Sequence, residues 1–318
     1  MDPMSDVLSG MQVRRFGYAR LEAGAPWGVS YPKHSACLGM ILEGKCWLSM
    51  ARIPEPIALQ AGDCYLIVHG DEHALRDHPS TPTRPMGDVL VVRSGIARLA
   101  GSGAPSVIVG GWFHFDRLSS QPLMKILPPL IHITASQVQA LGLDTTLRSL
   151  ANETRAPAPG AHIVVNRLAE VLFIQMIRAF VSSELDSEPG WLSALGDRQI
   201  GSALRLMHEQ VQRNWVVGEL AEAVGLSRSG FAHRFRTLVG EGPMQYLTNW
   251  RMFKASRLLR STDLKLSQIA RSVGYDSEAA FCHAFKRVMR LTPGEHRAAR
   301  GKPDRRNLAD SPAGQPDE

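Results

Sequence analysis

Two stretches near the C-terminus place polar and basic side chains at the spacing of one helix face. The first set is Arg228, Ser229, Ala232, His233 and Arg236, and the second is Glu278, Ala279, Cys282, His283 and Lys286. Positions three or four residues apart share a face of an α-helix, so each set forms one surface. Arginine and lysine bind phosphate, and serine and histidine can hydrogen-bond to base edges. The chemistry indicated is nucleic-acid binding.

Both sets belong to a sequence repeat. LAEAVGLSRSGFAHRFRTLVGEGP, from Leu220, aligns with IARSVGYDSEAAFCHAFKRVMRLTP, from Ile269, when one residue is inserted in the turn. The identical pairs are Ala221/Ala270, Val224/Val273, Gly225/Gly274, Phe231/Phe281, His233/His283, Phe235/Phe285 and Pro243/Pro293. We therefore expect the same small element twice.

Each copy has the features of a helix-turn-helix. Gly225 and Gly274 lie where a helix must end and turn, which often needs a positive φ. Ser227, and Asp276 or Ser277 in the second copy, can cap the next helix. The paired phenylalanines, four residues apart, face the core and leave the opposite side of that helix exposed. A second helix built in this way is shaped to enter a major groove.

The charge distribution and the segment between the copies agree with this interpretation. Residues 191–300 hold 17 Lys and Arg against nine Asp and Glu, whereas residues 1–190 hold 16 against 17. A single helix is predicted for MQYLTNWRMFKASRLLRS, and its basic residues Arg251, Lys254, Arg257 and Arg260 are expected to contact phosphate. Such a connector would hold two reading helices apart, and successive major grooves lie about 34 Å apart.

Residues 195–300 resemble the DNA-binding domain of bacterial AraC/XylS-family transcription regulators, through both repeat segments and the connector RMFKASRLL. The resemblance implies binding to double-stranded promoter DNA, recruitment of RNA polymerase, and activation more often than repression. It implies phosphate contacts for Arg236 and Lys286, with Arg228 on the same surface. It also implies base-facing positions, of which two are alanine and one is acidic: Ser229, Ala232, His233, Glu278, Ala279, Cys282 and His283.

The first half of the chain predicts a different fold. Short apolar runs such as CLGMILEG, KCWLSMARI and SVIVGGWFHFD, separated by turn signals, favour an antiparallel barrel or sandwich. The segment GDCYLIVHGDEH resembles the second motif of the cupin family, and residues 12–185 resemble the cupin-type sensor domain of one AraC subgroup. We therefore expect an α+β protein of two domains, with a cupin-like β-barrel plus helices followed by an all-α double helix-turn-helix.

The expected boundaries follow from these segments. They are an N-terminal tail at 1–11, a sensor and dimerisation domain at 12–185, a linker at 186–194, the DNA-binding domain at 195–300 and a disordered tail at 301–318. The helix predicted around 163–181 has an apolar face that exceeds what its own barrel needs, which predicts a homodimer.

Three hypotheses remain for the signal that the first domain senses. A metal site could use His34, Cys64, His69 and His73, although the paired histidine of the first cupin motif is missing at His34-Ser35-Ala36. Cys37, Cys46 and Cys64 could respond to an oxidant, which requires accessible thiols of lowered pKa. Otherwise an apolar barrel near Trp27, Trp47 and Trp112 could hold a small organic effector.

The composition argues against other classes of protein. The 318 residues are 44% hydrophobic and 21% charged, and no apolar run approaches the length of a membrane span. The N-terminus lacks the pattern of a signal peptide, so we expect a cytoplasmic location. The alternative of a metal cupin enzyme fused to a DNA-binding module is disfavoured by the incomplete first cupin motif. No common hydrolase, nucleotide-binding or metalloprotease motif is present either, so neither an enzyme nor a bound cofactor is predicted. A DNA-bending protein without sequence preference would not need the neutral first half.

Overall fold

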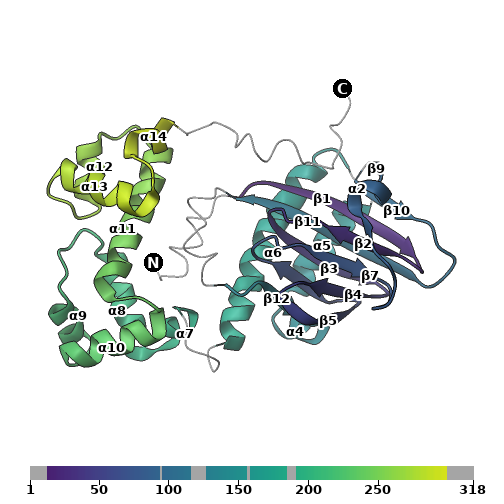
Figure 1. The fold of residues 1–318 in the computed structure, drawn as a ribbon, viewed down its shortest axis with the longest axis horizontal. Coiled ribbons are helices and arrows are strands. Elements are labelled where there is room, and N and C mark those ends of the chain that lie inside the picture. The colour runs from purple at the N-terminus through teal and green to yellow at the C-terminus, as the bar shows by residue number, and fades with distance from the viewer. Residues whose placement is uncertain (1–12, 94, 116–126, 156–157, 185–190, 299–318) are drawn as a thin grey trace. The chain divides into compact units, whose positions relative to one another are not determined.

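The computed structural model describes residues 13–93, 95–115, 127–155, 158–184 and 191–298 (Figure 1). The chain forms two compact units, which we call the β-domain (Val13–Phe115 with Leu127–Phe180) and the helical unit (from Val181). The predicted tails at 1–11 and 301–318 lie outside the described residues. So do residues 186–190 of the predicted linker, whereas 191–194 already belong to a helix. Within the described part of the chain, every helix is too short or too polar to serve as a membrane span.

The β-domain contains two sheets. The described strands are β1 (Val13–Gly24), β2 (Gly28–Tyr31), β3 (Ala36–Glu43), β4 (Lys45–Met50), β5 (Ile53–Gln60), β6 (Cys64–Ile67), β7 (His73–Arg76), β8 (Arg84–Pro85), β9 (Val92–Arg93), β10 (Ile96–Leu99), β11 (Pro105–Phe115) and β12 (Leu130–Ile133). One sheet has the order β12-β6-β3-β11-β1-β10-β9, and the other has the order β5-β4-β7-β2-β8. The predicted antiparallel pairing holds for most neighbours, but β1–β10 and β2–β8 are parallel.

The two sheets pack face to face around one hydrophobic cluster. It includes Val29 and Leu48 from the second sheet and Ile67 and Ile108 from the first. Strand β4 buries every second residue, as expected for a strand with one face on the core. All four residues of β6 are buried, because β6 lies in a sheet that is covered on both faces.

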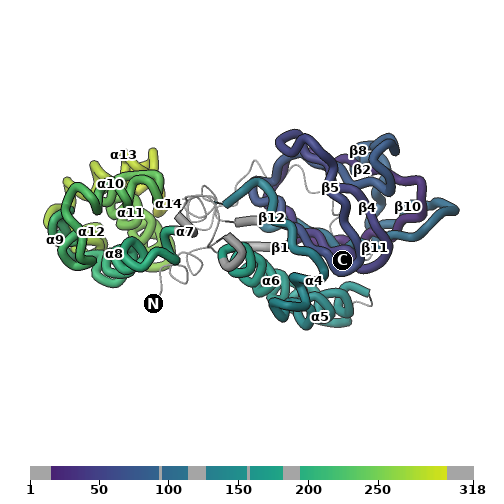
Figure 2. Tube along the Cα trace, turned by 90° about the horizontal axis from the view of Figure 1, so that it is seen from below, coloured from purple at the N-terminus to yellow at the C-terminus, as the bar shows by residue number. Residues whose placement is uncertain are grey.

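Helices cover the other face of the first sheet (Figure 2). They are α4 (Ala135–Ala140), α5 (Asp144–Arg155) and α6 (Ala161–Glu184), while the short α2 (Met86–Val89) follows β8. Phe173 of α6 contacts the ring of Phe113 at a centroid distance of 5.1 Å, and Phe113 contacts Phe16 at 4.7 Å. The Asn166 side chain also accepts a hydrogen bond from the Phe16 amide at 2.8 Å. These contacts fix α6 against β1 and β11.

The described residues of the helical unit form α-helices joined by turns and loops, with no strand among them. Its helices are α7 (Trp191–Gly196), α8 (Arg198–Glu209), α9 (Val217–Ala223), α10 (Arg228–Val239), α11 (Pro243–Ser261), α12 (Leu266–Ser272), α13 (Glu278–Met289) and α14 (Pro293–Ala298). The unit therefore begins earlier than the predicted boundary at 195, because α7 starts at Trp191 and buries Ala194. The predicted α+β architecture of two domains is confirmed.

Candidate nucleic-acid interface

Helices α9–α10 and α12–α13 form two helix-turn-helix units with the same turn. In the first, the Leu226 amide donates to the Ala221 carbonyl at 2.9 Å, and in the second Tyr275 donates to Ala270 at 2.9 Å. Gly225 has φ of 69° and Gly274 has φ of 80°, as the repeat predicts. The sharp turn therefore has the same backbone hydrogen bond and the same left-handed glycine in both copies.

Serine caps the second helix of each unit. Ser227 accepts a hydrogen bond from the Gly230 amide at 3.1 Å, and Ser277 accepts one from the Ala280 amide at 3.1 Å. Of the two candidate caps in the second copy, Ser277 rather than Asp276 is the one that the structure uses. A capped N-terminus fixes the first turn of α10 and α13, and this turn carries the first residues of each predicted DNA-contacting set.

The paired phenylalanines anchor α10 and α13 in the core. The rings of Phe231 and Phe235 lie 5.6 Å apart, as do those of Phe281 and Phe285, and all four side chains are fully buried. The opposite face of each helix is therefore turned away from the core. The predicted DNA-contacting residues on that face are largely exposed: Arg228, Ser229, His233 and Arg236 on α10, and Glu278, Ala279, His283 and Lys286 on α13.

Two predicted contact residues are less accessible than the rest. Ala232 is half-buried, and Cys282 packs against the hydrophobic cluster that contains Phe281 and Phe285. Burial, together with nearby Glu278, raises the pKa of the Cys282 thiol, so this group remains protonated at neutral pH. Within each set, the exposed polar side chains are the better placed for contact with DNA.

Arg234 lies between these exposed residues but is held within the unit. It donates to Asp197, whose carboxylate also accepts from the Gln199 and Ile200 amides at the start of α8. Burial opposes ionisation of Asp197, yet these hydrogen bonds together lower its pKa. Arg234 thus ties α10 to α8 and sets the position of the helix.

The connector α11 joins the two helix-turn-helix units, and two of its four basic residues have contacts within the protein. Arg251 donates to the carbonyls of Val211 at 2.9 Å and Arg213 at 2.7 Å, and its guanidinium lies 5.7 Å from the ring of Tyr275. Lys254 donates to the His208 carbonyl at 3.2 Å. These two side chains therefore bind the backbone of the protein itself, where phosphate contacts were expected.

Arg251 also explains why the second turn needs glycine. A Cβ atom on Gly274 would collide with the guanidinium of Arg251 and with the Gln212 carbonyl. The connector, the segment that follows α8 and the turn of the second helix-turn-helix unit therefore contact one another at Arg251. This packing fixes the second helix-turn-helix unit relative to α11. No sequence pattern predicts it, because arginine in a basic region normally faces solvent.

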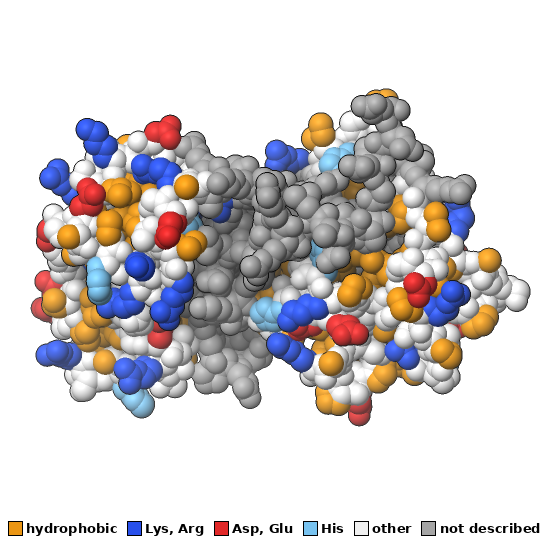
Figure 3. Space-filling model, turned by 45° about the horizontal axis from the view of Figure 1, so that its top comes forward, with side chains coloured by type: hydrophobic (Ala, Val, Ile, Leu, Met, Phe, Trp, Pro, Cys, Tyr) orange, Lys and Arg blue, Asp and Glu red, His pale blue; other side chains and the backbone are white. Residues whose placement is uncertain are grey.

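Lys and Arg side chains are spread over the visible face of the helical unit, with Asp and Glu side chains among them (Figure 3). This agrees with the excess of basic residues in the segment 191–300. A positive surface attracts DNA before specific contacts form.

The predicted metal ligands in the β-domain do not come together. The His34 ring packs edge-on against Trp112, His73 stacks on Tyr31, and Cys64 is fully buried in β6. The remaining candidate, His69, joins none of them, since the described residues contain no cluster of three or more His, Cys, Asp or Glu that could hold a metal ion. The described residues therefore give no support to a metal site at His34, Cys64, His69 and His73.

The cysteines of the β-domain lack the properties of reactive thiols. Cys37, Cys46 and Cys64 are all buried. Burial raises the pKa of each thiol to about 12. A redox-sensing cysteine needs access and a lowered pKa, and these residues show the opposite of both. Small buried side chains that fill the core are the simpler interpretation.

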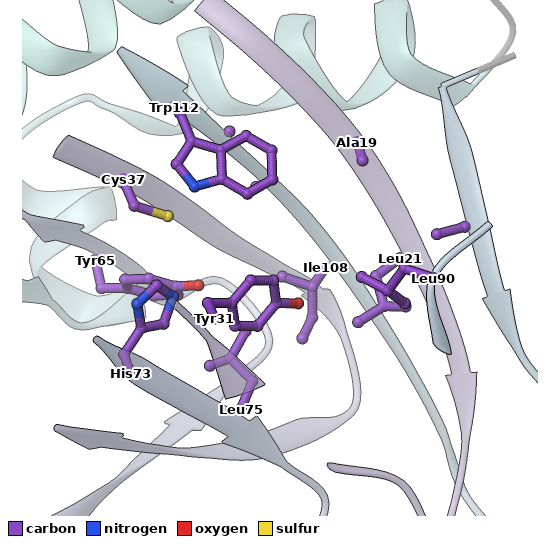
Figure 4. A pocket seen from close by; sticks show the side chains of 13 residues that line it. Ala19, Leu21, Tyr31, Cys37, Tyr65, His73, Leu75, Leu90, Ile108 and Trp112 are labelled. Atoms are coloured by element: carbon purple, nitrogen blue, oxygen red, sulfur yellow. The ribbon is translucent and has the colours of Figure 1, made fainter. Parts of the chain in front are cut away.

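A cavity of about 40 Å³ lies between the two sheets (Figure 4). It is lined by 13 residues, including Tyr31, Cys37, Tyr65, His73 and Trp112. Of the three tryptophans that were considered for an effector site, Trp112 lines this cavity, whereas the other two do not. The sequence pattern does not predict Tyr31 or Tyr65 as lining residues, because nothing in the local pattern shows that distant strands bring them together.

Comparison with known proteins gives matches along most of the chain. A family profile described as Cupin matches residues 2–182, and one described as Helix-turn-helix domain matches residues 220–299. A putative AraC-like transcription regulator of Streptomyces lividans is 35% identical over 93% of this chain and 98% of its own length. A protein of the same description from Streptomyces antibioticus is 36% identical over the same shares. The HTH-type transcriptional regulator AlkR of Acinetobacter baylyi is 30% identical over 76% of this chain and 89% of its own.

Proposed function

Because the chain belongs to the AraC-like family of transcription regulators, we propose that it controls a promoter by binding DNA with both helix-turn-helix units. The carrying observation is the identical construction of the two units, in which buried phenylalanines and a serine cap present an exposed polar face on α10 and α13. In this proposal His233, His283 and Ser229 contact bases, and Arg228, Arg236 and Lys286 contact phosphates. The remaining predicted residues, Ala232, Glu278, Ala279 and Cys282, lie beside them.

Footprinting of the full-length protein tests DNA recognition. The probe is a set of random genomic fragments together with the region upstream of the protein's own gene. We expect protection of a short site that spans two adjacent major grooves. Uniform protection of all fragments would instead indicate an architectural protein without sequence preference, and the proposal would fail.

Run-off transcription tests the effect of binding. The resemblance implies that the bound protein recruits RNA polymerase, so we propose activation, with the DNA target reached in the cytoplasm. Adding the protein to polymerase and a template that contains the protected site should raise the amount of transcript. A fall in transcript would identify a repressor, whereas no change on a protected template would contradict control of that promoter.

We also propose that the β-domain is a sensor that binds a small effector and has no catalytic role. The cavity between its sheets supports this assignment, since it is enclosed by aromatic and aliphatic side chains. The three buried cysteines, with their raised pKa values, do not favour an oxidant as the signal.

Helix α6 supports the proposal of a homodimer. It buries one face against the β-domain, yet four large apolar side chains remain exposed: Ile163, Val164, Val171 and Ile174. Positions 164, 171 and 174 recur at the spacing of one helix face, which is typical of a helix that packs against a partner. A second copy of the same helix is the partner that we propose.

Sedimentation velocity of the full chain tests this dimer. Replacing Val171 and Ile174 by glutamate should convert a dimer to a monomer, because buried charges would face each other across the interface. Val91→Glu is the matched control, since Val91 is 68% exposed in the same domain but lies away from α6. A monomeric unsubstituted protein would remove the dimer and leave DNA binding intact.

A further inference from the structure

The cavity between the two sheets contains no charged side chain. None of the 13 lining residues is Lys, Arg, Asp or Glu. An ionised ligand placed there would lose its hydration and find no opposite charge, which is costly in a protein interior. The cavity therefore excludes carboxylates and ammonium ions and favours a neutral ligand.

His73 provides a hydrogen-bond acceptor in the wall of this cavity. Its Nδ1 lies 3.0 Å from the carbonyl oxygen of Asp71. A carbonyl oxygen only accepts, so Nδ1 carries the proton and Nε2 has the lone pair. Burial lowers the pKa of His73 to about 4, which keeps the ring neutral at physiological pH. The structure gives Nε2 no hydrogen-bond partner among the described residues, although His73 is only 5% exposed.

The orientation of the His73 ring is fixed by its neighbours. Tyr31 stacks on it at a centroid distance of 4.8 Å and an interplanar angle of 9°. The two residues face each other as a pair across β2 and β7. Figure 4 shows the imidazole beside the ring of Tyr31, on the side of the cavity opposite Ala19. A buried acceptor held in one orientation is suited to a single directed hydrogen bond.

Apart from the thiol of Cys37 and the hydroxyl groups of Tyr31 and Tyr65, the remaining wall is aromatic and aliphatic, and one position in it is set by glycine. The ring of Tyr65 lies against Gly39 of the neighbouring strand, where any Cβ atom would overlap it. Glycine at this position therefore lets the Tyr65 ring lie back from the cavity. Trp112 and Leu90 also line the space and are half-buried, so their large side chains could move to admit a ligand.

We propose that this cavity binds a small, uncharged, mainly apolar molecule with one hydroxyl group, which donates its hydrogen bond to Nε2 of His73. This inference rests on the proposed sensor role of the β-domain and names the chemical class of its effector. A water molecule needs roughly 10–15 Å³ of such space. The cavity of about 40 Å³ thus accepts a ligand of a few heavy atoms, and a longer ligand requires displacement of Trp112.

The test uses three probes of equal chain length with the full-length protein: n-butanol, butyrate and n-butylamine. Saturation-transfer-difference NMR titrations give a dissociation constant for each. We expect saturable binding of n-butanol, with the two charged probes at least tenfold weaker. Butyrate or butylamine binding as tightly as n-butanol would overturn the proposal. So would the absence of n-butanol binding up to about 10 mM, which would mean that the cavity holds water only.

Two substitutions locate the binding site. His73→Phe preserves a ring that can stack on Tyr31 but removes the acceptor, and we expect about tenfold weaker binding of n-butanol. Gly39→Ala adds no polar group but displaces the Tyr65 ring toward the cavity, and we expect binding to be lost. His78→Phe is the matched control, because the His78 side chain is exposed and forms hydrogen bonds with nearby Ser80. Unchanged binding in both test variants would contradict the assigned site.

The outcomes for the effector and for DNA recognition are separable. Footprinting without any ligand tests the helical unit alone, and the NMR titration does not depend on DNA. A specific footprint combined with preferred binding of butyrate would leave the proposed regulator intact and overturn the hydroxyl-bearing effector. Both circular dichroism and the footprint of each variant establish that it is folded.

Discussion

The two helix-turn-helix units have nearly the same interior but different surfaces. Each buries a pair of phenylalanine rings 5.6 Å apart, turns on a left-handed glycine and caps its second helix with serine. On the surface, α10 carries three arginines and no acidic residue. Helix α13 begins with Glu278, ends with Lys286 and Arg287 near its last turn, and half-buries Cys282. The difference shows that the residues that stabilise each helix-turn-helix unit are separate from the exposed residues that are expected to face DNA.

The last turns differ as well. Helix α10 is followed by the C-cap residue Gly240 with φ of 85°, whereas α13 is followed by the C-cap residue Arg290 with φ of 61°. A left-handed conformation is unfavourable for a residue that has a side chain, whereas glycine adopts it without this free-energy cost. The second unit therefore reaches the same geometry with a less favourable residue.

The largest expected effect tests whether the two interiors are equivalent. Phe235→Ala and Phe285→Ala each leave a large cavity, and each should lower the free energy of unfolding of the helical unit by about 3–5 kcal/mol. Denaturant unfolding followed by circular dichroism measures this loss. Leu291→Ala is the control, because Leu291 is exposed and its loss should change little. A loss below about 1 kcal/mol in only one of the two variants would show that the units are unequal inside.

The next effect concerns the two surfaces. His233→Ala should weaken binding to the footprinted site by about 1–3 kcal/mol relative to random duplex. Arg236→Ala should weaken both DNAs alike and reduce the salt slope by about one. Fluorescence anisotropy at several salt concentrations separates these outcomes, and the pair His283→Ala and Lys286→Ala repeats the comparison in the second unit. Equal losses on every sequence for His233→Ala would exclude a base contact.

A smaller effect is expected at the two helix ends. Gly240→Ala should destabilise the helical unit by about 1 kcal/mol, because alanine is strained at a positive φ. Arg290→Gly should have the opposite sign and stabilise it by about 0.5 kcal/mol, since it removes that strain. Thermal unfolding of the two variants measures both changes. Stabilisation by Gly240→Ala would contradict the assigned strain, because alanine would then be favourable at the left-handed C-cap position of α10.

The smallest effect sharpens the charge difference. Glu278→Gln removes the acidic residue from α13 and should strengthen binding to random duplex about twofold, because surface charges interact weakly. The same change should slightly destabilise the protein, since a negative charge at a helix N-terminus is favourable. Fluorescence anisotropy measures the change in DNA affinity, and thermal unfolding independently measures the change in stability. Weaker binding to every DNA would show that Glu278 takes part in a contact rather than repelling phosphate.

Much of the helical unit could be predicted from the sequence, because its signals are local. The turn glycines, the serine caps and the phenylalanine spacing each depend on residues within one or two helical turns. The position of Arg251 could not be predicted, since its partners Val211 and Arg213 lie far away in the chain. The start of α7 at Trp191 was also missed, because the preceding Pro and Gly indicated a linker.

The β-domain was predictable as a fold class but not as a site. Alternating apolar runs indicated strands, yet which strands pair depends on contacts between distant residues. His73 was selected as a metal ligand because of its place in a motif. In the structure, pairing of β7 with β2 sets its ring on Tyr31 and its Nδ1 on the Asp71 carbonyl, which suits a hydrogen bond instead.

The serine caps and phenylalanine pairs also affect how this protein can change over generations. Because those residues hold each reading helix without help from Ser229, His233 or His283, a single mutation at one of these exposed positions leaves the fold intact. One recognition helix can therefore acquire a new base-sequence preference while the other still binds its half of the original DNA site. A lineage that carries this duplicated unit can move to new promoters in small steps, each of which remains functional.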